Sequence, residues 1–494
     1  MSMILPQPIP LLTRQQILHV EESALSSVSA HELMDWAGKA AFDHLLKTWP
    51  AVKKIVVACG AGNNGGDGYV VARLAHLSGK QVTIWHPLGT SQSDPAKAAA
   101  LECTKLNILM TANNTDINWS SIDVVVDGLM GIGYQGTPLK AEIKGAIDTI
   151  NWAQKPVLSL DCPSGLNVDT GCVDDCAVSA TETVTFLARK RGLFTGDALD
   201  YCGKVTVKDL SISADPALLC SLYDIHSILQ VFTPRRRTSY KGTYGHVLII
   251  GGNSGYAGAA RLAGLGALRC GAGLVSLATH PDHCAGVAGA VPELMVHGIK
   301  SPESIVPLID RASTLVIGPG LGQDHWAQVL MDKVLDSSKP LIIDADALNL
   351  LAKMNRPQRQ NWILTPHPGE AARLCSTPVE SIQRDRFKAV EDLTERYGGV
   401  VVLKGPGTLI KTQNGSITLC PYGNPGMASG GMGDLLSGVI AGLVAQGYGI
   451  EESAVMGTYI HAYAADLAAQ EGERGMIATD LLSPLRKLVN GILN

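Results

Sequence analysis

The stretch that decides the fold of the first half of the chain is Gly60-Ala61-Gly62-Asn63-Asn64-Gly65-Gly66-Asp67-Gly68. It follows the β-rich segment Ile55–Cys59 and precedes Tyr69–Leu77, which has a helical pattern. Five glycines in nine residues let the backbone approach a ligand closely, and the start of the next helix offers free N–H groups to a phosphate. The stretch therefore predicts a strand, a glycine-rich turn and a helix at a phosphate or dinucleotide site, with a purely structural turn as the alternative.

Similar β-rich segments alternate with helical ones along the whole chain. A capping box formed by Ser29 and Glu32 predicts a helix over Ala30–Thr48. The predicted strands of the first half continue at Gln81–Trp85, Asp123–Asp127, Pro156–Asp161, Thr183–Leu187 and Lys204–Lys208; those of the second half are His246–Gly251, Leu274–Thr279, Thr314–Gly318, Pro340–Asp344, Trp362–Pro366 and Val400–Lys404. This alternation predicts an α/β protein with mostly parallel sheets. Asn414-Gly415, between Leu409–Thr412 and Ser416–Cys420, predicts an antiparallel hairpin.

The length and composition indicate two large globular domains. The chain has 494 residues, of which 46% are hydrophobic, and the segment Ser211–Gly245 has no strong sheet pattern. We therefore expect domains at residues 1–225 and 226–494. A net charge of −5 disfavours nucleic acid as a partner, and no apolar run is long enough to span a membrane. The eleven scattered cysteines and the lack of a secretory signal favour the cytoplasm.

Two aspartates strengthen the expectation of a site in the first half. Asp127 and Asp161 each end an apolar strand, where the ligands of open α/β sheets collect. Asp127 is followed by the glycine-rich run Gly128–Gly136, and Asp161 leads Cys162-Pro163-Ser164-Gly165. One such aspartate could simply cap the next turn, but three strand ends of this kind in one domain favour a shared site.

The three motifs NNGGDG, DGLMGIG and DCPSG, in this order, resemble the YjeF-type NAD(P)H-hydrate epimerases over about residues 10 to 215. The resemblance implies a Rossmann-like domain that interconverts the R and S epimers of hydrated NADH and NADPH. It implies a potassium ion held by Asn64, Asp127 and Ser164. It also implies that the substrate is bound by Asn63, Asn64, Gly65, Gly66, Asp67, Gly131, Ile132, Gly133, Tyr134, Gln135, Gly136, Thr137 and Asp161, with Asp161 as the candidate catalytic residue.

In the second half, the most informative stretch runs from Gly423 to Asp434 and leads into the apolar helical segment Leu435–Val444. A glycine-rich helix start presents N–H groups to developing negative charge, and a carboxylate in the first turn can accept a proton from a substrate hydroxyl. The alternative is a helix that packs closely through its glycines and is capped by Asp434. Asp434 is therefore the candidate general base of the second half.

The motifs KGTYGH at Lys241–His246, TPHPGE at Thr365–Glu370, KGPGT at Lys404–Thr408 and SGGMGD at Ser429–Asp434 resemble the NAD(P)H-hydrate dehydratases of the ribokinase-like superfamily. This resemblance covers about residues 230 to 494. It implies that the hydrated nucleotide is surrounded by Ala259, Gly320 or Gly322, His367 and Asp434. It further implies that the AMP part of the phosphate donor is contacted by Lys404, Gly405, Pro406, Gly407, Thr408 and Gly433.

Together, the two halves predict a bifunctional enzyme that repairs hydrated nicotinamide cofactors. We expect the first half to equilibrate the epimers of NADHX and NADPHX, and the second to dehydrate the S epimer with ADP, or alternatively ATP, and Mg²⁺. A ribokinase-like kinase of a small alcohol or vitamin precursor is one alternative. A non-catalytic nucleotide-binding or RNA-associated first half is another. We also expect a homo-oligomer, although the sequence does not give the number of subunits.

Overall fold

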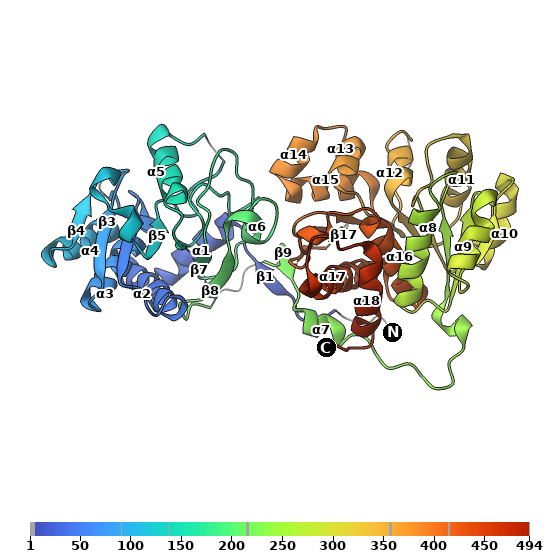
Figure 1. The fold of residues 1–494 in the computed structure, drawn as a ribbon, viewed down its shortest axis with the longest axis horizontal. Coiled ribbons are helices and arrows are strands. Elements are labelled where there is room, and N and C mark those ends of the chain that lie inside the picture. Colours follow the sequence, from blue (N-terminus) through green and yellow to red (C-terminus); the bar gives the residue numbers. More distant parts are fainter. Residues whose placement is uncertain are drawn as a thin grey trace. The chain divides into compact units, whose positions relative to one another are not determined.

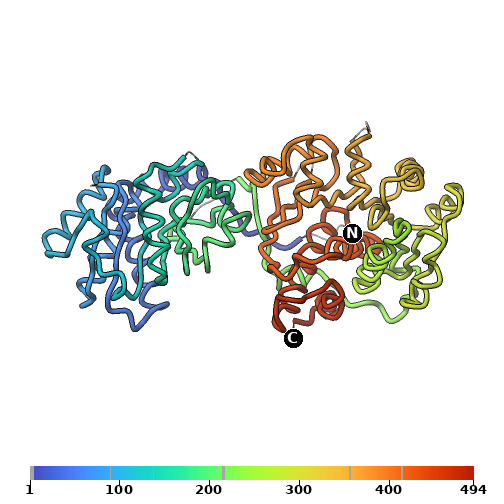
Figure 2. The backbone as a smooth tube through the Cα atoms, turned by 45° about the horizontal axis from the view of Figure 1, so that its top comes forward, coloured from blue at the N-terminus to red at the C-terminus, as the bar shows by residue number. Residues whose placement is uncertain are grey.

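A computed structural model describes residues 5–89, 91–136, 138–213, 217–354, 358–412 and 415–493 (Figures 1 and 2). The chain divides into two compact units, Pro10–Cys220 and Ser221–Asn494, and the second unit also includes the segment Met1–Ile9. The predicted boundary at residue 225 places that segment in the first domain, whereas the structure groups it with the second. Among the described residues, no helix is long and apolar enough to cross a membrane.

The N-terminal unit is built on a seven-stranded sheet within the described residues, and all of its strand pairs are parallel. Its order is β4-β3-β2-β5-β6-β7-β8. The strands are β2 (Lys54–Cys59), β3 (Gln81–Trp85), β4 (Leu109–Thr111), β5 (Val124–Gly128), β6 (Val157–Leu160), β7 (Glu182–Phe186) and β8 (Lys204–Lys208). The direction of winding reverses between β2 and β5, which is the order of a Rossmann-like doubly wound sheet and the place where such sheets bind ligands.

Helices cover both faces of this sheet (Figure 1). They are α1 (Arg14–Ala24), α2 (Ala30–Thr48), α3 (Asn63–Leu77), α4 (Asp94–Lys105), α5 (Ala141–Trp152) and the short α6 (Ala198–Tyr201). Alternate residues of β2 join different cores: Val57 packs with the α2 and α3 side, whereas Val56 packs with the α5 side. This division follows from the two-residue period of a strand that is buried on both faces.

The glycine-rich stretch differs from its prediction as a turn, because α3 already begins at Asn63 rather than Tyr69. Its glycines are required by close packing. A Cβ atom on Gly65 would lie 2.0 Å from the carbonyl oxygen of Gly60, and one on Gly66 would lie 2.4 Å from Met34 Cε. The tertiary contacts with the preceding strand and with α2 therefore override the low helix propensity of glycine.

A second sheet has eleven strands within the described ranges, in the order β1-β9-β18-β17-β16-β15-β14-β13-β10-β11-β12. Nine of these strands lie wholly in the C-terminal unit, whereas β1 and β9 cross the two boundaries between the units. The strands from β16 to β12 in this order are parallel, and β17 and β18 add antiparallel partners. The strands are β1 (Ile9–Leu11), β9 (Cys220–Leu222), β10 (His246–Ile250), β11 (Leu274–Thr279), β12 (Met295–Gly298), β13 (Thr314–Ile317), β14 (Leu341–Ile343), β15 (Trp362–Leu364), β16 (Val400–Leu403), β17 (Thr408–Thr412) and β18 (Ile417–Cys420). The parallel part reverses its winding between β10 and β13, as the N-terminal sheet does between β2 and β5.

The helices of this unit cover both faces of the sheet (Figure 1). They are α7 (Ile225–Leu229), α8 (Ala257–Arg269), α9 (Cys284–Ala290), α10 (Val306–Arg311), α11 (His325–Leu335), α12 (Ala345–Leu351), α13 (Pro368–Cys375), α14 (Val379–Arg384), α15 (Arg386–Tyr397), α16 (Met432–Ala445), α17 (Ile450–Ala468) and α18 (Leu482–Leu488). Glycines bring α8 and α16 close together, since a Cβ on Gly438 would lie 1.8 Å from the carbonyl oxygen of Ala263. This contact packs the middle of α16 directly against α8.

The α/β class, the predicted strands and the helix Ala30–Thr48 with its capping box are confirmed, with strand ends shifted by one or two residues. The antiparallel pairing of β17 with β18 is also confirmed, although Asn414 in the predicted turn lies outside the described residues. The short strands β1, β4, β9 and β12 were not predicted. Each has only three or four residues, which is too short for a clear two-residue pattern.

Candidate functional site

The N-terminal unit has a cavity of about 430 Å³ at the reversal point of its sheet. Its lining includes eight of the residues predicted to bind substrate: Asn63, Asn64, Asp67, Gly131, Ile132, Gly133, Tyr134 and Asp161. They come from the start of α3, the loop after β5 and the end of β6. Three segments that are distant in the sequence therefore meet around one space that is large enough for part of a nucleotide.

Asp161 lies at the wall of this cavity in an unusual backbone conformation. Its φ is 65°, in the left-handed region that residues other than glycine rarely adopt. Its N–H donates to the carbonyl oxygen of Val184 at 2.7 Å. Its Oδ1 accepts hydrogen bonds from Lys190 Nζ at 2.6 Å, from the Phe186 N–H at 3.1 Å and from Thr185 Oγ1 at 3.3 Å. The carboxylate is thus held firmly through one oxygen.

Two further carboxyl groups surround the same cavity. Glu21 reaches it from α1 and Asp67 from α3. Burial raises the pKa of Asp67, and the charges of Asp161 and Glu21 raise it further. Burial and the charge of Asp161 also raise the pKa of Glu21, while Lys190 opposes that rise. The cavity therefore combines acids that tend to hold a proton with one firmly anchored aspartate.

The three residues predicted to hold potassium lie together beside this cavity. Asp127 is fully buried, and its oxygens accept from Ser164 Oγ at 2.6 Å, Ser159 Oγ at 2.9 Å and the Ser164 N–H at 3.0 Å. Asn64 Nδ2 donates to the Met130 carbonyl oxygen at 2.8 Å, but Asn64 Oδ1 is buried without a hydrogen-bond partner among the described residues. An unpartnered amide oxygen beside a buried carboxylate is a donor set that suits a hard cation.

The remaining N-terminal candidates lie outside the cavity lining. Gly65 and Gly66 pack against Gly60 and Met34, as described above, so their positions are explained by helix packing. Gln135 is exposed, and a Cβ on Gly136 would meet Asp174 Oδ2 at 2.7 Å. Thr137 lies outside the described residues.

In the C-terminal unit, the predicted substrate residues Ala259, Gly320 and Gly322 gather at the reversal point between β10 and β13. A Cβ on Gly320 would lie 3.2 Å from Ala259 Cβ, and the Gly322 N–H donates to Asp346 Oδ2 at 2.8 Å. Gly320 and Gly322 both have positive φ angles, 59° and 74°. These glycines thus allow the loop after β13 to turn closely past the start of α8.

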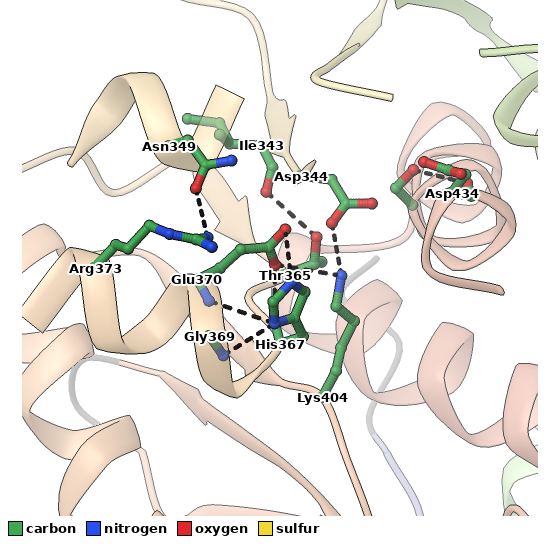
Figure 3. A network of polar contacts seen from close by, with 11 residues as sticks. Ile343, Asp344, Asn349, Thr365, His367, Gly369, Glu370, Arg373, Lys404 and Asp434 are labelled. Atoms are coloured by element: carbon green, nitrogen blue, oxygen red, sulfur yellow. Dashed lines mark hydrogen bonds and ion pairs between the residues drawn. The ribbon is translucent and has the colours of Figure 1, made fainter. Parts of the chain in front are cut away.

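A network of charged side chains lies at the ends of the next three strands (Figure 3). Lys404, after β16, donates to Asp344 Oδ1 at 2.7 Å and lies 3.8 Å from Glu370 Oε2. Burial lowers the pKa of Lys404, but the charges of Asp344 and Glu370 outweigh it, so the net shift is upward. Burial, together with the charge of Asp344, raises the pKa of Glu370 to about 7 against the opposing charge of Lys404.

His367 directly precedes α13 and acts as its N-terminal cap. Its Nδ1 accepts from the N–H groups of Gly369 at 3.0 Å and Glu370 at 3.4 Å. Burial and the charges of Lys404 and Arg373 lower the pKa of His367. A neutral ring whose Nδ1 accepts these bonds carries its proton on Nε2, and the side chain is 51% exposed. His367 Nε2 lies 3.4 Å from Glu370 Oε1, so its N–H is directed toward the charged network.

Asp434 lies in the first turn of α16, whereas Asp344 and Lys404 follow strands β14 and β16 (Figure 3). The N-cap of α16, Gly431, has a φ of 93° and makes no side-chain capping bond. Burial raises the pKa of Asp434 to about 6, the charge of Asp344 adds to the shift, and Lys404 opposes it. The geometry thus combines a helix start suited to an anion with a carboxylate whose pKa lies near the working range of a general base.

The predicted nucleotide residues follow β16 and adjoin the same helix. A Cβ on Gly433 would lie 3.0 Å from Lys404 Nζ, so this glycine lets the ammonium approach the start of α16. Gly405 and Gly407 have φ angles of 135° and 62°. Pro406 separates them, and the Thr408 hydroxyl donates to the Gly405 carbonyl oxygen at 3.0 Å. The loop is therefore a tight turn that starts at the ammonium of Lys404.

Sequence reasoning missed Asp344, Glu370 and Lys190 as site residues. Asp344 is 1% exposed, and its Oδ2 has no hydrogen-bond partner within the described ranges. Its place at the end of a predicted strand is the signal that could have identified it. Glu370 is the last residue of the motif TPHPGE. Lys190 lies 29 residues after Asp161, and no local sequence pattern links Lys190 to Asp161.

Comparisons with known proteins identify the family of this chain. The family described as NAD(P)H-hydrate dehydratase matches residues 247–487, and the YjeF-related protein N-terminus matches residues 30–192. The bifunctional NAD(P)H-hydrate repair enzyme Nnr of Coxiella burnetii is 48% identical over 491 residues, covering 97% of this chain and 99% of that protein. The chain belongs to the family of bifunctional NAD(P)H-hydrate repair enzymes.

Other members of the repair-enzyme family and one solved structure extend this result. The Nnr protein of Escherichia coli is 42% identical, covering 95% of this chain and 92% of its own length. The ADP/ATP-dependent NAD(P)H-hydrate dehydratase of Bacillus subtilis, co-crystallised with ATP and Mg²⁺, is 32% identical with a TM-score of 0.50. It covers 54% of this chain and 96% of its own. The C-terminal unit thus has the ribokinase-like fold of a dehydratase domain, and the N-terminal unit is the epimerase domain of the family.

Proposed function

We propose that this repair-enzyme family member restores hydrated NADH and NADPH in two steps. The N-terminal unit interconverts the R and S epimers, and the C-terminal unit dehydrates the S epimer with ADP as phosphoryl donor, giving AMP and phosphate. The observation that carries the proposal is the match of one chain, over nearly its full length, to bifunctional repair enzymes. The same match favours repair over a small-alcohol kinase or a non-catalytic nucleotide-binding half.

In the first step, the cavity beside Asp161 would hold the hydrated nicotinamide ring. Epimerisation requires either ring opening or loss and re-addition of the hydroxyl group at the hydrated carbon. In the second route, a proton converts the leaving hydroxyl to water, and water then returns to the opposite face with release of a proton. A carboxylate at this position can move the proton or stabilise the positively charged ring intermediate. Asp161 is our candidate for this role.

Asn64, Asp127 and Ser164 fit a potassium ion through the unpartnered Asn64 Oδ1 and the adjacent buried carboxylate. The ion would supply positive charge for the phosphates of the nucleotide, which Asp127 and Asp161 would otherwise repel. Burial raises the pKa of Asp127, while hydrogen bonds from Ser164 and Ser159 act in the opposite direction. A cation would add to these bonds in keeping Asp127 ionised.

In the second step, Asp434 would accept the proton of the ring hydroxyl as that oxygen attacks the terminal phosphoryl group of ADP. The bond between that phosphorus and the bridging oxygen breaks, and AMP leaves. Elimination of phosphate, with loss of the proton on the neighbouring ring carbon, then restores the reduced ring. Phosphorylation helps because phosphate is a far better leaving group than hydroxide. Ala259, Gly320, Gly322 and the half-exposed ring of His367 would surround the nucleotide that is repaired.

Lys404, Gly405, Pro406, Gly407, Thr408 and Gly433 would contact the AMP part of the donor. Within the described residues, no cluster of three or more His, Cys, Asp or Glu side chains could hold a metal ion. Mg²⁺ that accompanies a nucleotide is bound by phosphates with one or two carboxylates, so it does not need such a cluster. The unpartnered Asp344 Oδ2 fits this requirement, and Mg²⁺ there would neutralise charge on the transferred phosphoryl group.

The donor can be tested by quantifying nucleotides during repair of pure S epimer. We expect one AMP to be released for each reduced ring restored from ADP, and a slower reaction with ATP. Repair without stoichiometric release of a dephosphorylated nucleotide would contradict phosphoryl transfer. A homo-oligomer and a cytoplasmic location stay predictions of the sequence.

A further inference from the structure

Lys190 is a buried cation that the proposed chemistry does not yet use. Its side chain is fully buried, although the residue lines the epimerase-domain cavity. Its Nζ donates to Asp161 Oδ1 at 2.6 Å, to Thr185 Oγ1 at 2.7 Å and to the Phe186 carbonyl oxygen at 3.0 Å. All three N–H bonds of the ammonium group are therefore used. A buried lysine is stable in its charged form only when it is paired and hydrogen-bonded in this way.

The backbone around Lys190 is also fixed. The N–H of Leu12 donates to the Arg189 carbonyl oxygen at 2.8 Å, and the N–H of Arg191 donates to the Leu12 carbonyl oxygen at 3.0 Å. Lys190 is held between these two bonds, opposite Leu12. The ammonium group is thus preorganised before any ligand binds.

The contacts divide the two oxygens of Asp161 into different roles. Oδ1 accepts from Lys190, Thr185 and Phe186, whereas no hydrogen bond from the described residues reaches Oδ2. Because Asp161 lines the cavity and is 14% exposed, Oδ2 is the oxygen available to a ligand. Charge-assisted hydrogen bonds are about twice as strong as neutral ones, so Lys190 dominates the anchoring.

We propose that Lys190 is a positioning residue of the epimerase reaction, which holds Oδ1 of Asp161 so that Oδ2 faces the substrate. This rests on the proposed role of Asp161. Among the three carboxyl groups at the cavity, Asp161 alone has a hydrogen-bonded cation within the described structure. Lys190 therefore fixes the orientation of this one carboxyl group at the cavity wall.

Other titratable and charged groups face the pair. Arg14 and Glu21 come from α1, Asp67 from α3, and Cys162 follows Asp161. Arg14 Nε donates to the Ile132 carbonyl oxygen at 2.9 Å. Burial raises the pKa of the Cys162 thiol, so it stays protonated near neutral pH. The charge of Lys190 opposes the rise in the pKa of Glu21, so a substitution of Lys190 could change exchange through Glu21 instead of Asp161.

The test follows exchange between purified R and S epimers by chromatography, without ADP, over a range of substrate concentrations. For Lys190→Met we expect kcat for exchange to fall by at least about ten-fold while KM stays within a few-fold of the parent, because a displaced Asp161 slows the reaction more than it weakens nucleotide binding. For Lys190→Ala, added ethylamine should restore exchange, because the vacated space opens to the cavity. Ethylamine should not rescue Lys190→Met, whose side chain fills that space.

Controls separate this role from a loss of folding and from failure of the Asp161 assignment. ADP-dependent repair of pure S epimer should be unchanged in every variant, and Lys204→Met, at an exposed lysine on the neighbouring strand, should behave like the parent. The loss in kcat should persist in a Glu21→Gln background. Parental kcat in both Lys190 variants, while Asp161→Asn is inactive, would overturn the proposal. An active Asp161→Asn variant would instead refute the role of Asp161 itself.

Discussion

Replacing Asp434 with Asn changes the charge at the start of α16 with almost no change in shape. Burial and the charge of Asp344 raise the pKa of Asp434 to about 6, so most of the parent protein carries an ionised base at pH 7. Removing a general base typically lowers a rate by about 10²–10⁴-fold. We therefore expect dehydration of pure S epimer to fall by that factor, while exchange between the epimers continues at the parental rate.

The same substitution should change the pH dependence of both activity and stability. Parental dehydration should decline as the pH falls through about 6, and the Asn variant should lack this limb. The folded state binds this proton more tightly than the unfolded chain, whose pKa is near 3.8, so ionised Asp434 costs stability above pH 6. The Asn variant should therefore be more stable than the parent at pH 8, by about 1–3 kcal/mol.

The assay is recovery of the absorbance of the reduced nicotinamide ring with ADP in excess, paired with urea unfolding at pH 5 and pH 8. The gain in stability should be smaller at pH 5, where most parental Asp434 is protonated in the folded state. A variant that dehydrates the S epimer within a few-fold of the parent would refute Asp434 as the base. Lower stability than the parent at pH 8 would refute the electrostatic explanation of its raised pKa.

Three further predictions test other parts of the structure. Asp127→Ala should abolish potassium-dependent epimer exchange and leave ADP-dependent dehydration intact, measured with KCl replaced by tetramethylammonium chloride; equal exchange in both salts by the parent would refute the ion site. Gly65→Ala should lower the free energy of unfolding by at least about 1–3 kcal/mol because its Cβ would meet a backbone oxygen, whereas Gly62→Ala, with nothing within 4 Å, should have little effect. Fragment 217–494 should dehydrate only the S epimer. Fragment 226–494 should melt at a lower temperature than fragment 217–494, because it lacks strand β9. Equal melting temperatures of the two fragments would contradict the assignment of β9 to the eleven-stranded sheet.

The sequence predicts the central strands well because their β-branched residues form continuous apolar runs. Val124–Gly128 and Val400–Leu403 are buried on both faces, and each begins with three consecutive valines. Such runs of β-branched residues are typical of strands that are buried on both faces. Strand order is a different matter, since hydrophobic periodicity contains no information about which strands are neighbours. The shared winding of the two sheets, with reversals at β2/β5 and β10/β13, became visible only in the structure.

The candidate site was predictable where one segment contains the whole signal. Asp434 follows a run of glycines, and Asp161 ends a strand next to a turn motif. The start of α3 at Asn63 was not predictable from propensity, because tertiary packing against Gly60 determines it. The Lys190–Asp161 pair joins residues from the end of β6 and from the turn after β7, and only the parallel pairing of those strands brings them together.

Both repair steps on one chain can be tested in a single reaction. Purified R epimer, ADP, Mg²⁺ and K⁺ are supplied to the parent chain and the return of the reduced ring is followed, with the Asp161→Asn chain as the matched control. We expect complete recovery by the parent, no recovery when the nucleotide is omitted, and recovery limited to the spontaneous rate of epimer exchange in the Asp161→Asn chain. Recovery by the parent that is no faster than spontaneous exchange, or that proceeds without a nucleotide, would contradict the proposal that one chain performs both repair steps.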